Sequence, residues 1–209
     1  MTSLPRPCLM LVTEPSPRLP EIVTEAVAGG VNVVQWRDKV TPKDELRPQI
    51  KAMYAAVGGA LLVVNGPPAL ARIWGRHLPS SGGSFRFLQE HLGDRLAFGR
   101  SVHSVASAHA AAGEGADYIV AGTIFASQSH PDIPPAGLDF LRDVCAAVSI
   151  PVLAIGGVTP ENAADCIHAG AAGLAVLSPL MRAADPRAIA QTYRTALDAA
   201  WEEHQCSSS

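Results

Sequence analysis

The sequence predicts a single (β/α)8 barrel, a fold in which eight parallel strands alternate with helices around a closed sheet. Three observations favour it. Short apolar runs recur along the chain, amphipathic stretches separate them, and a glycine with one or two small residues often stands between a helix and the next run. The length of 209 residues lies near the lower end of the roughly 200–400 residues that such barrels occupy.

The strand candidates are apolar on successive residues, which is typical of strands covered on both faces. They are the runs 8–12, 31–35, 61–64, 77–78, 96–98, 117–121, 151–155 and 173–176. The fourth run is the weakest. An open, doubly wound sheet is the competing fold, and the absence of a GxGxxG pattern after the first run argues against it.

Helical periodicity fills the gaps between these runs. Residues 19–27 carry an apolar stripe at helical spacing, and residues 189–201 do the same near the end of the chain. Thr159 followed by Pro160 is typical of an N-cap and the first position of a helix. No linker interrupts the alternation, so we expect one domain over residues 1–206, with 207–209 as a disordered tail.

The composition indicates which partners and which compartment this protein is expected to have. Hydrophobic residues make up 48% of the chain, charged residues 17%, and the net charge is −3, so a nucleic acid or an anionic membrane is not an expected partner. The four cysteines lack metal-ligand spacing and indicate reduced thiols in a cytoplasmic protein. No run approaches the roughly 20 apolar residues of a membrane helix. The low charge and many small residues leave room for a homodimer surface.

Two loops at one end of the predicted barrel have the character of an anion site. Gly156 and Gly157 follow the seventh strand, and Leu177 and Ser178 follow the eighth, where Pro179 suits the start of a one-turn helix. Barrels of this class commonly bind phosphate after strands seven and eight, at the N-terminus of a short helix. We therefore predict a phosphate site there. The alternative is a pair of turn glycines with no ligand.

Polar side chains gather at other strand ends. Gln35, Arg37 and Lys39 alternate along the second strand and share one side if that strand continues. Inside a barrel mouth they would bind an anion, and in a loop they would be solvated; Trp36 would then face the helices. Asn65 and Ser101 offer neutral hydrogen bonds for orienting a heterocycle.

Taken in order, the segments QWRDK, VVNG, LPSSGGSF, GRSVHS, GTIF and AIGGVTPEN resemble one family over residues 8–203. It is the thiamine phosphate synthase and thiazole tautomerase superfamily. The resemblance implies a phosphate-binding TIM barrel of thiamine biosynthesis, whose small-molecule partner is a phosphorylated thiazole.

The synthase branch of that superfamily joins thiazole phosphate to hydroxymethylpyrimidine diphosphate and depends on Mg²⁺. The resemblance implies that Gln35, Arg37 and Lys39 hold the diphosphate substrate. It also implies an Asn-Asp pair after strand three and a second acid after strand four, both binding Mg²⁺. Here Asn65 is followed by Gly66, and residues 78–84 contain no acid. Because Mg²⁺ needs carboxylate oxygens, the sequence disfavours this transferase, and Mg²⁺ is expected as a cofactor only if the synthase alternative holds.

The tautomerase branch matches more of these segments, so the sequence favours an isomerase without a cofactor. It would aromatise a carboxythiazole phosphate tautomer by proton transfer. Thr123 stands where that branch has its catalytic histidine, and proton transfer calls for a base near neutral pH. We therefore hypothesise that His130 is the general base. The alternative is that His130 is an exposed loop residue. Thr123, Ser127 and Ser129 are expected to contact the substrate.

Two further histidines have structural interpretations. His103 is expected to cap the fifth helix and to orient Ser101, and His77 to face the barrel interior as a buried histidine with hydrogen-bond partners. A third functional alternative, beside isomerase and transferase, is a non-catalytic regulatory protein that binds a phosphorylated ligand, in which Thr123 marks lost chemistry.

Overall fold

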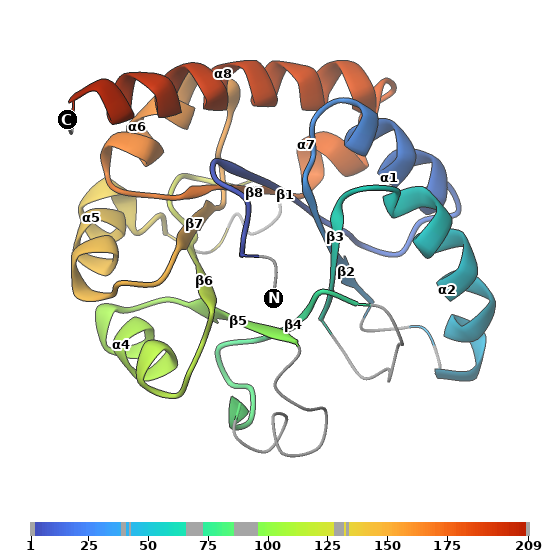
Figure 1. The fold of residues 1–209 in the computed structure, drawn as a ribbon, viewed down its shortest axis with the longest axis horizontal. Coiled ribbons are helices and arrows are strands. Elements are labelled where there is room, and N and C mark those ends of the chain that lie inside the picture. The colour runs from blue at the N-terminus through green and yellow to red at the C-terminus, as the bar shows by residue number, and fades with distance from the viewer. Residues whose placement is uncertain are drawn as a thin grey trace.

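The computed structural model describes residues 3–38, 41, 43–65, 73–85, 96–127, 132 and 134–207. Its centre is a closed barrel of eight strands in sequence order, shown end-on in Figure 1. The strands are β1 (Cys8–Val12), β2 (Val33–Arg37), β3 (Leu61–Asn65), β4 (Gly75–Leu78), β5 (Ala97–Val102), β6 (Tyr118–Gly122), β7 (Val152–Ile155) and β8 (Gly173–Val176). The predicted (β/α)8 barrel is thereby confirmed.

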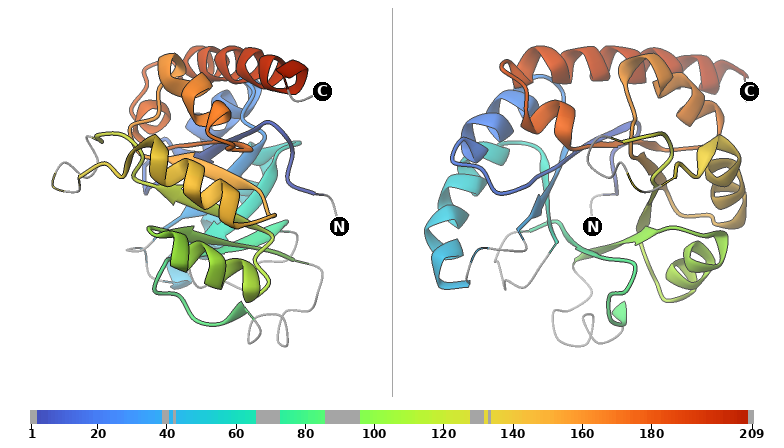
Figure 2. Two further views of the ribbon diagram at one scale, coloured as in Figure 1. Left: turned by 90° about the vertical axis from the view of Figure 1, so that its left-hand side faces the viewer. Right: turned by 180° about the vertical axis from the view of Figure 1, so that it is seen from behind.

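The helices lie outside the barrel wall (Figures 1 and 2). They are α1 (Leu19–Ala28), α2 (Lys43–Val57), α4 (Val105–Gly113), α5 (Gly137–Ala147), α6 (Ala163–His168), α7 (Ser178–Met181) and α8 (Pro186–Ser207). A 3-10 turn, Pro160–Asn162, leads into α6, so Thr159 and Pro160 open a helical segment as predicted. Helix α8 packs against α1 and α6 and also contacts β1.

Every neighbouring pair of strands is parallel, and the barrel closes where β8 pairs with β1. At this seam Gly173 is the register partner of Cys8. A β-carbon on Gly173 would lie 2.1 Å from the carbonyl oxygen of Cys8. The two backbones therefore approach more closely than any side chain would allow at this position.

The predicted strand positions are right, but several boundaries shift. The second strand ends at Arg37, two residues beyond the predicted 31–35, so Gln35 and Arg37 both lie within it. The fifth extends from the predicted 96–98 to Val102, which brings Arg100 and Ser101 into the sheet. The last helix includes Ser207, one residue into the predicted tail, and residues 208–209 lie outside the described chain.

Two apolar cores explain the continuous apolar runs. The larger one fills the space between the barrel and the helices and contains Trp36, as predicted. The smaller one fills the barrel interior and includes Leu4, Met10, Tyr118 and Leu153. Residues alternate between the two cores along each strand, and because both environments are apolar the sequence shows no polar alternation. Leu4, only 6% exposed, closes the amino end of the barrel.

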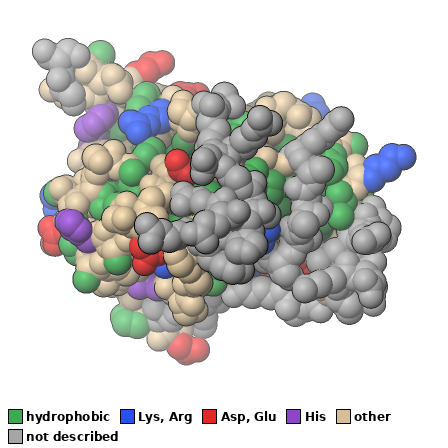
Figure 3. All heavy atoms as spheres, turned by 60° about the horizontal axis from the view of Figure 1, so that its bottom comes forward, with side chains coloured by type: hydrophobic (Ala, Val, Ile, Leu, Met, Phe, Trp, Pro, Cys, Tyr) green, Lys and Arg blue, Asp and Glu red, His purple; other side chains and the backbone are tan. Residues whose placement is uncertain are grey.

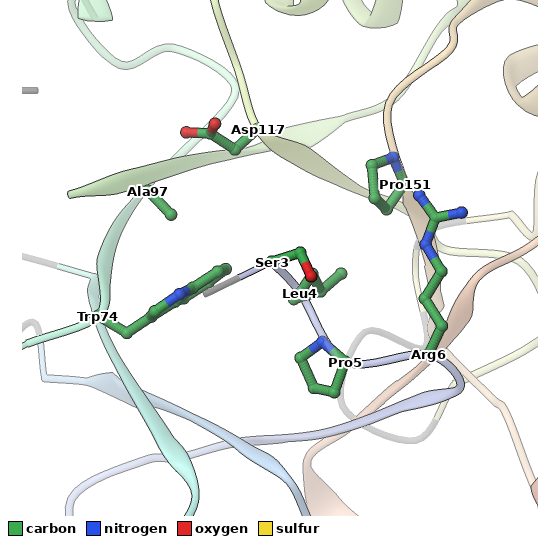
Figure 4. A pocket seen from close by; sticks show the side chains of 8 residues that line it. All are labelled: Ser3, Leu4, Pro5, Arg6, Trp74, Ala97, Asp117 and Pro151. Atoms are coloured by element: carbon green, nitrogen blue, oxygen red, sulfur yellow. The ribbon is translucent and has the colours of Figure 1, made fainter. Parts of the chain in front are cut away.

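A pocket of about 520 Å³ lies at this amino end. Figure 4 shows the N-terminal segment crossing it, with Trp74 on one side and Pro151 on the other. Trp74, Ala97, Asp117 and Pro151 each lie at or just before the start of a strand. The pocket is therefore at the opposite end of the barrel from the predicted site.

Charges of both signs occur on the described surface, some of them in ion pairs such as Arg18–Glu21 and Arg142–Asp139. In Figure 3, basic, acidic and hydrophobic side chains are interspersed on the described part of that face. All four cysteines are free. Among the described residues, no helix combines the length and the apolar character that crossing a bilayer requires.

Candidate functional site

Polar groups at the ends of β1, β2 and β3 meet at the carboxyl end of the barrel. The side-chain amide of Asn65 donates to Oε1 of Gln35 at 3.0 Å, and both residues are buried. The backbone N–H of Arg37 donates to Oγ1 of Thr13 at 3.1 Å, which ties the ends of β1 and β2 together. Arg37 is half-buried and follows Gln35 at the strand period of two. The structure thus brings three predicted site residues, Gln35, Arg37 and Asn65, to adjacent strand ends.

A second polar group crosses from β4 to β6 inside the barrel. Nε2 of His77 lies 2.8 Å from Oγ of Ser101, and Nδ1 lies 3.3 Å from the hydroxyl of Tyr118. His77 is 2% exposed and Tyr118 is fully buried. His77 is therefore the buried, hydrogen-bonded histidine that the sequence predicts. Burial, and secondarily the charge of Arg100, lowers the pKa of His77 from 6.5 to about 3.

This lowered pKa makes acid destabilise the fold. An unfolded histidine binds a proton below about pH 6.5, whereas the buried His77 does so only near pH 3. Between these values the unfolded state binds more protons, so the free energy of unfolding falls as the pH falls. We expect the His77 contribution to decrease by about 1.4 kcal/mol per pH unit between pH 6 and pH 4.

Urea unfolding at several pH values checks this prediction by comparing the wild type with His77→Gln. The variant keeps a donor toward Ser101 but has no titrating group, so its stability should depend less steeply on pH. His109→Gln, at an exposed position of α4, should retain the wild-type slope. Equal slopes for the wild type and His77→Gln would contradict the assignment.

The glycine pair after β7 is packed against the loop that follows β6. Gly156 and Gly157 have φ values of +94° and +61°, which favour glycine. A β-carbon on Gly156 would lie 2.4 Å from Cγ2 of Thr123, and one on Gly157 would lie 2.3 Å from the carbonyl oxygen of Ala126. These glycines are therefore required by a neighbouring loop, independently of any ligand. The phosphate site on their amides stays a prediction.

A short helix follows β8, as the sequence predicts. Ser178 opens α7 and Leu177 precedes it, with Leu177 O accepting the amide of Met181 at 2.9 Å. Strands β7 and β8 are paired, so the Gly156–Gly157 turn and Ser178 lie at neighbouring strand ends. Both segments are half-exposed.

Of the residues predicted in the loop after β6, Thr123 and Ser127 are described, and both are half-buried. Thr123 contacts Gly156, as given above. Ser129, His130 and Lys39 lie outside the described residues.

The role predicted for His103 is wrong. Ser104, not His103, caps α4: its side chain accepts from the amide of Ser107 at 3.1 Å. Ser101 is contacted by His77, because Ser101 points into the barrel while His103, two residues on, has left the strand. Nδ1 of His103 instead lies against the carbonyl oxygen of Gly122 at the end of β6.

The site does not fit a carboxylate-bound Mg²⁺. Strand β3 ends at Asn65 and β4 at Leu78, and no Asp or Glu occurs between positions 46 and 89 of the sequence. Among the described residues, no group of three or more His, Cys, Asp or Glu side chains is placed to hold a metal ion. Mg²⁺ favours carboxylate and other hard oxygen ligands, and the protein does not supply a carboxylate set at these two strand ends.

The sequence did not single out Thr13 or Tyr118. Both belong to apolar runs or follow them directly, so nothing local marks them as polar partners of Arg37 and His77. The alternation of residues along β6 could have indicated Tyr118, because Tyr118 and Val120 face the barrel interior while their neighbours face the helices. A tyrosine that faces a buried interior needs a hydrogen-bond partner for its hydroxyl.

Comparisons with known proteins assign the chain to a family. A family model described as thiamine monophosphate synthase matches residues 9–180. A protein of Methanoculleus marisnigri named thiamine-phosphate synthase is 39% identical over 184 residues, which cover 85% of this chain and 87% of that protein. One of Acidithiobacillus ferrooxidans with the same name is 37% identical over 177 residues, covering 80% and 82%. Thiamine phosphate pyrophosphorylase from Pyrococcus furiosus superposes with a TM-score of 0.80 at 30% identity, covering 92% of this chain and 96% of that one.

These relatives contradict the expectation of a thiazole tautomerase, since they are named for the synthase reaction. The isomerase assignment is therefore wrong, and the segments that favoured it have another role in the structure. Those segments are 65–66, 78–85 and 99–104, and described residues in them contribute to the barrel itself: Asn65 bonds Gln35, and Gly99 packs on the Tyr118 ring. Such segments support the fold and do not discriminate between reactions. With its fold and most of its length shared with these proteins, the chain belongs to the thiamine monophosphate synthase family.

Proposed function

We propose that this protein is a transferase that joins a thiazole phosphate to hydroxymethylpyrimidine diphosphate and so makes thiamine phosphate. The observation that carries the proposal is the 39% identity, over 85% of the chain, to a protein named thiamine-phosphate synthase. The polar groups at the carboxyl end of the barrel support it. This proposal replaces the isomerase, and with it the role of His130 as a general base for tautomerisation lapses.

The reaction needs no general base. The ring nitrogen of the thiazole donates its lone pair to the exocyclic methylene carbon of the pyrimidine, and a C–N bond forms. The C–O bond to the diphosphate breaks, and its electron pair leaves with the diphosphate. The main demand on the protein is therefore to neutralise negative charge on the leaving group. Arg37, at the end of β2, is placed for this task, and Lys39 follows it in the sequence.

Neutral groups at the mouth suit the two heterocycles. The amides of Gln35 and Asn65 hold each other across the ends of β2 and β3, and each retains hydrogen-bonding capacity. Fixed amides of this kind can orient a ring that carries both donors and acceptors. Ser101, on the far side of the barrel, is a further such group, and Thr123 and Ser127 follow β6.

We place the thiazole phosphate at Gly156, Gly157, Leu177 and Ser178. The Gly157 carbonyl accepts from the side chain of Asn162 at 3.1 Å, whereas the Gly157 amide has no partner among the described residues. A backbone amide without a protein partner at a positive-φ turn is a suitable donor to a phosphate oxygen. The start of α7 lies at the next strand end and adds Ser178.

Removing the Ser178 hydroxyl should weaken binding of the thiazole phosphate alone. We expect Ser178→Ala to raise the KM for this substrate about 5-fold with little change in kcat, as for a bond made equally in the ground and transition states. Ser149→Ala, at an exposed position before β7, is the matched control and should leave KM unchanged. An unaltered KM in Ser178→Ala would remove this residue from the phosphate site.

The proposed activity is tested on the full chain with both substrates and Mg²⁺ in the buffer. We expect diphosphate and thiamine phosphate to form in equal amounts. Calorimetric binding of thiazole phosphate without diphosphate release would overturn the transferase and leave a ligand-binding protein. Binding of neither substrate would overturn the whole assignment.

A further inference from the structure

Ser101, His77 and Tyr118 form a chain of hydrogen bonds from the barrel interior to its mouth. Ser101 lies one residue before the end of β5 and is half-buried, whereas His77 and Tyr118 are buried below it. The rings of His77 and Tyr118 are 5.8 Å apart, and that of Trp74 lies 5.9 Å further down. Only the Ser101 end of this chain faces the proposed substrates.

The number of protons in this chain is fixed by burial. Because burial keeps the pKa of His77 far below neutrality, the imidazole is neutral and carries one N–H. Burial likewise raises the pKa of Tyr118, with Cys8 and Asp117 adding to the effect, so its phenol stays protonated. The chain therefore has three donors, the hydroxyls of Ser101 and Tyr118 and one imidazole N–H, and two hydrogen bonds between its members.

The surroundings of Tyr118 decide the direction of those bonds. Its ring belongs to the apolar interior core with Leu4, Met10 and Val33, and among the described residues the recorded partner of its hydroxyl is Nδ1 of His77. A buried hydroxyl that donates to nothing is costly. The Tyr118 hydroxyl therefore donates to Nδ1, and the imidazole proton is on Nε2, where it is donated to Oγ of Ser101.

The opposite arrangement is less favourable. With the proton on Nδ1, the imidazole would donate to Tyr118 and accept from Ser101. The Tyr118 proton would then point into the apolar core without an acceptor. Among the described residues, the hydrogen-bond partner of this hydroxyl is His77.

We infer that the hydroxyl of Ser101 is a dedicated hydrogen-bond donor to the ligand, and that Tyr118 and His77 are positioning residues that fix this polarity. Since Ser101 already accepts from His77, its own proton has no acceptor among the described residues. The ligand must therefore present a lone pair at this point, either an oxygen of a diphosphate or a ring nitrogen. The identity of that ligand rests on the proposed function, whereas the polarity of the chain does not.

Nitrogen NMR of the imidazole rings tests the polarity directly. In ¹⁵N-labelled protein, the resonances of His77 are identified among the seven histidines by their loss in His77→Gln. We expect a neutral ring protonated at Nε2 and unprotonated at Nδ1 at pH 7. In Tyr118→Phe the donor to Nδ1 is gone, and the resonances should shift toward a mixture of tautomers. Tyr193→Phe, which removes another buried hydroxyl, one that donates to Val158 O, should leave the His77 tautomer unchanged. A wild-type ring protonated at Nδ1 would overturn the inference.

Calorimetry with each substrate separately identifies the acceptor. We expect Ser101→Ala to weaken one of the two, pyrimidine diphosphate or thiazole phosphate, about 10-fold. Tyr118→Phe should weaken the same ligand about 3-fold, because Ser101 can then turn toward His77. Full affinity for both ligands in Ser101→Ala would overturn the donor role. The expected tautomer and affinity loss, found without diphosphate release, would support the inference while the transferase fails.

Discussion

Gly173→Ala is expected to destabilise the protein by about 3 kcal/mol or more, the largest effect on stability among the substitutions considered. A β-carbon at this position would meet three backbone atoms of Cys8 at 2.1 to 2.8 Å. Backbone atoms of a paired strand cannot rotate away as a side chain can. The seam between β8 and β1 would have to open, and the barrel closes only through that pair.

Urea and thermal unfolding of the purified variant check this prediction. Gly113→Ala is the matched control, because a β-carbon at the end of α4 would meet nothing within 4 Å. Its stability should lie within about 0.5 kcal/mol of the wild type. A Gly173→Ala protein that unfolds together with the control would show that the seam adjusts, and would contradict the close approach described above.

Arg37→Ala is expected to lower kcat/KM of the proposed transferase about 100-fold or more. A donor aimed at developing charge is typically worth 10²–10³ in rate, roughly the range found when one such group is removed. Arg37 has the required position: it shares the inward parity of Gln35, and its backbone is anchored to Thr13. The loss should fall mainly on kcat, since charge on the leaving diphosphate grows as the C–O bond breaks.

Two further variants make the Arg37 result specific. Arg37→Lys retains the charge but loses the bidentate hydrogen bonding of the guanidinium. Its kcat/KM should be about 10-fold higher than that of Arg37→Ala. Arg142→Ala removes an exposed arginine of α5 that pairs with Asp139, and should keep wild-type rates. An Arg37→Ala enzyme within 3-fold of the wild type would exclude this residue from the proposed chemistry.

The barrel was predictable because its strands are buried on both faces. Runs such as 8–12 and 173–176 coincide with β1 and β8. The boundary that moved furthest, the end of β5, has polar residues inside the sheet. Arg100 contacts Glu114, Phe85 and the carbonyl of Gly83 outside the barrel, and Ser101 finds His77 inside it. These partners come from distant parts of the chain, so local periodicity gave no reason to continue the strand.

The positions of several candidate site residues in the barrel were predictable, whereas the choice between reactions was not. Gln35 and Arg37 could be placed on one side of a strand by parity, and Asn65 could be placed at a strand end because it follows the apolar run 61–64. The choice between reactions depended on short segments that also build the barrel, such as Gly99 against Tyr118. Likewise, the glycines at 156 and 157 indicate that something lies close to this backbone, and in the structure it is the loop after β6. A sequence pattern alone does not distinguish such a loop from a ligand.

The position of Leu4 bears on how such a protein would handle two substrates. With Leu4 held in the interior core, the described residues close the amino end of the barrel, and ligands of the predicted site would enter at the carboxyl end. Under the proposed function, both reactants and both products would pass through the carboxyl end of the barrel. The burial of Leu4 would therefore make substrate entry and product release compete for the same end of the barrel.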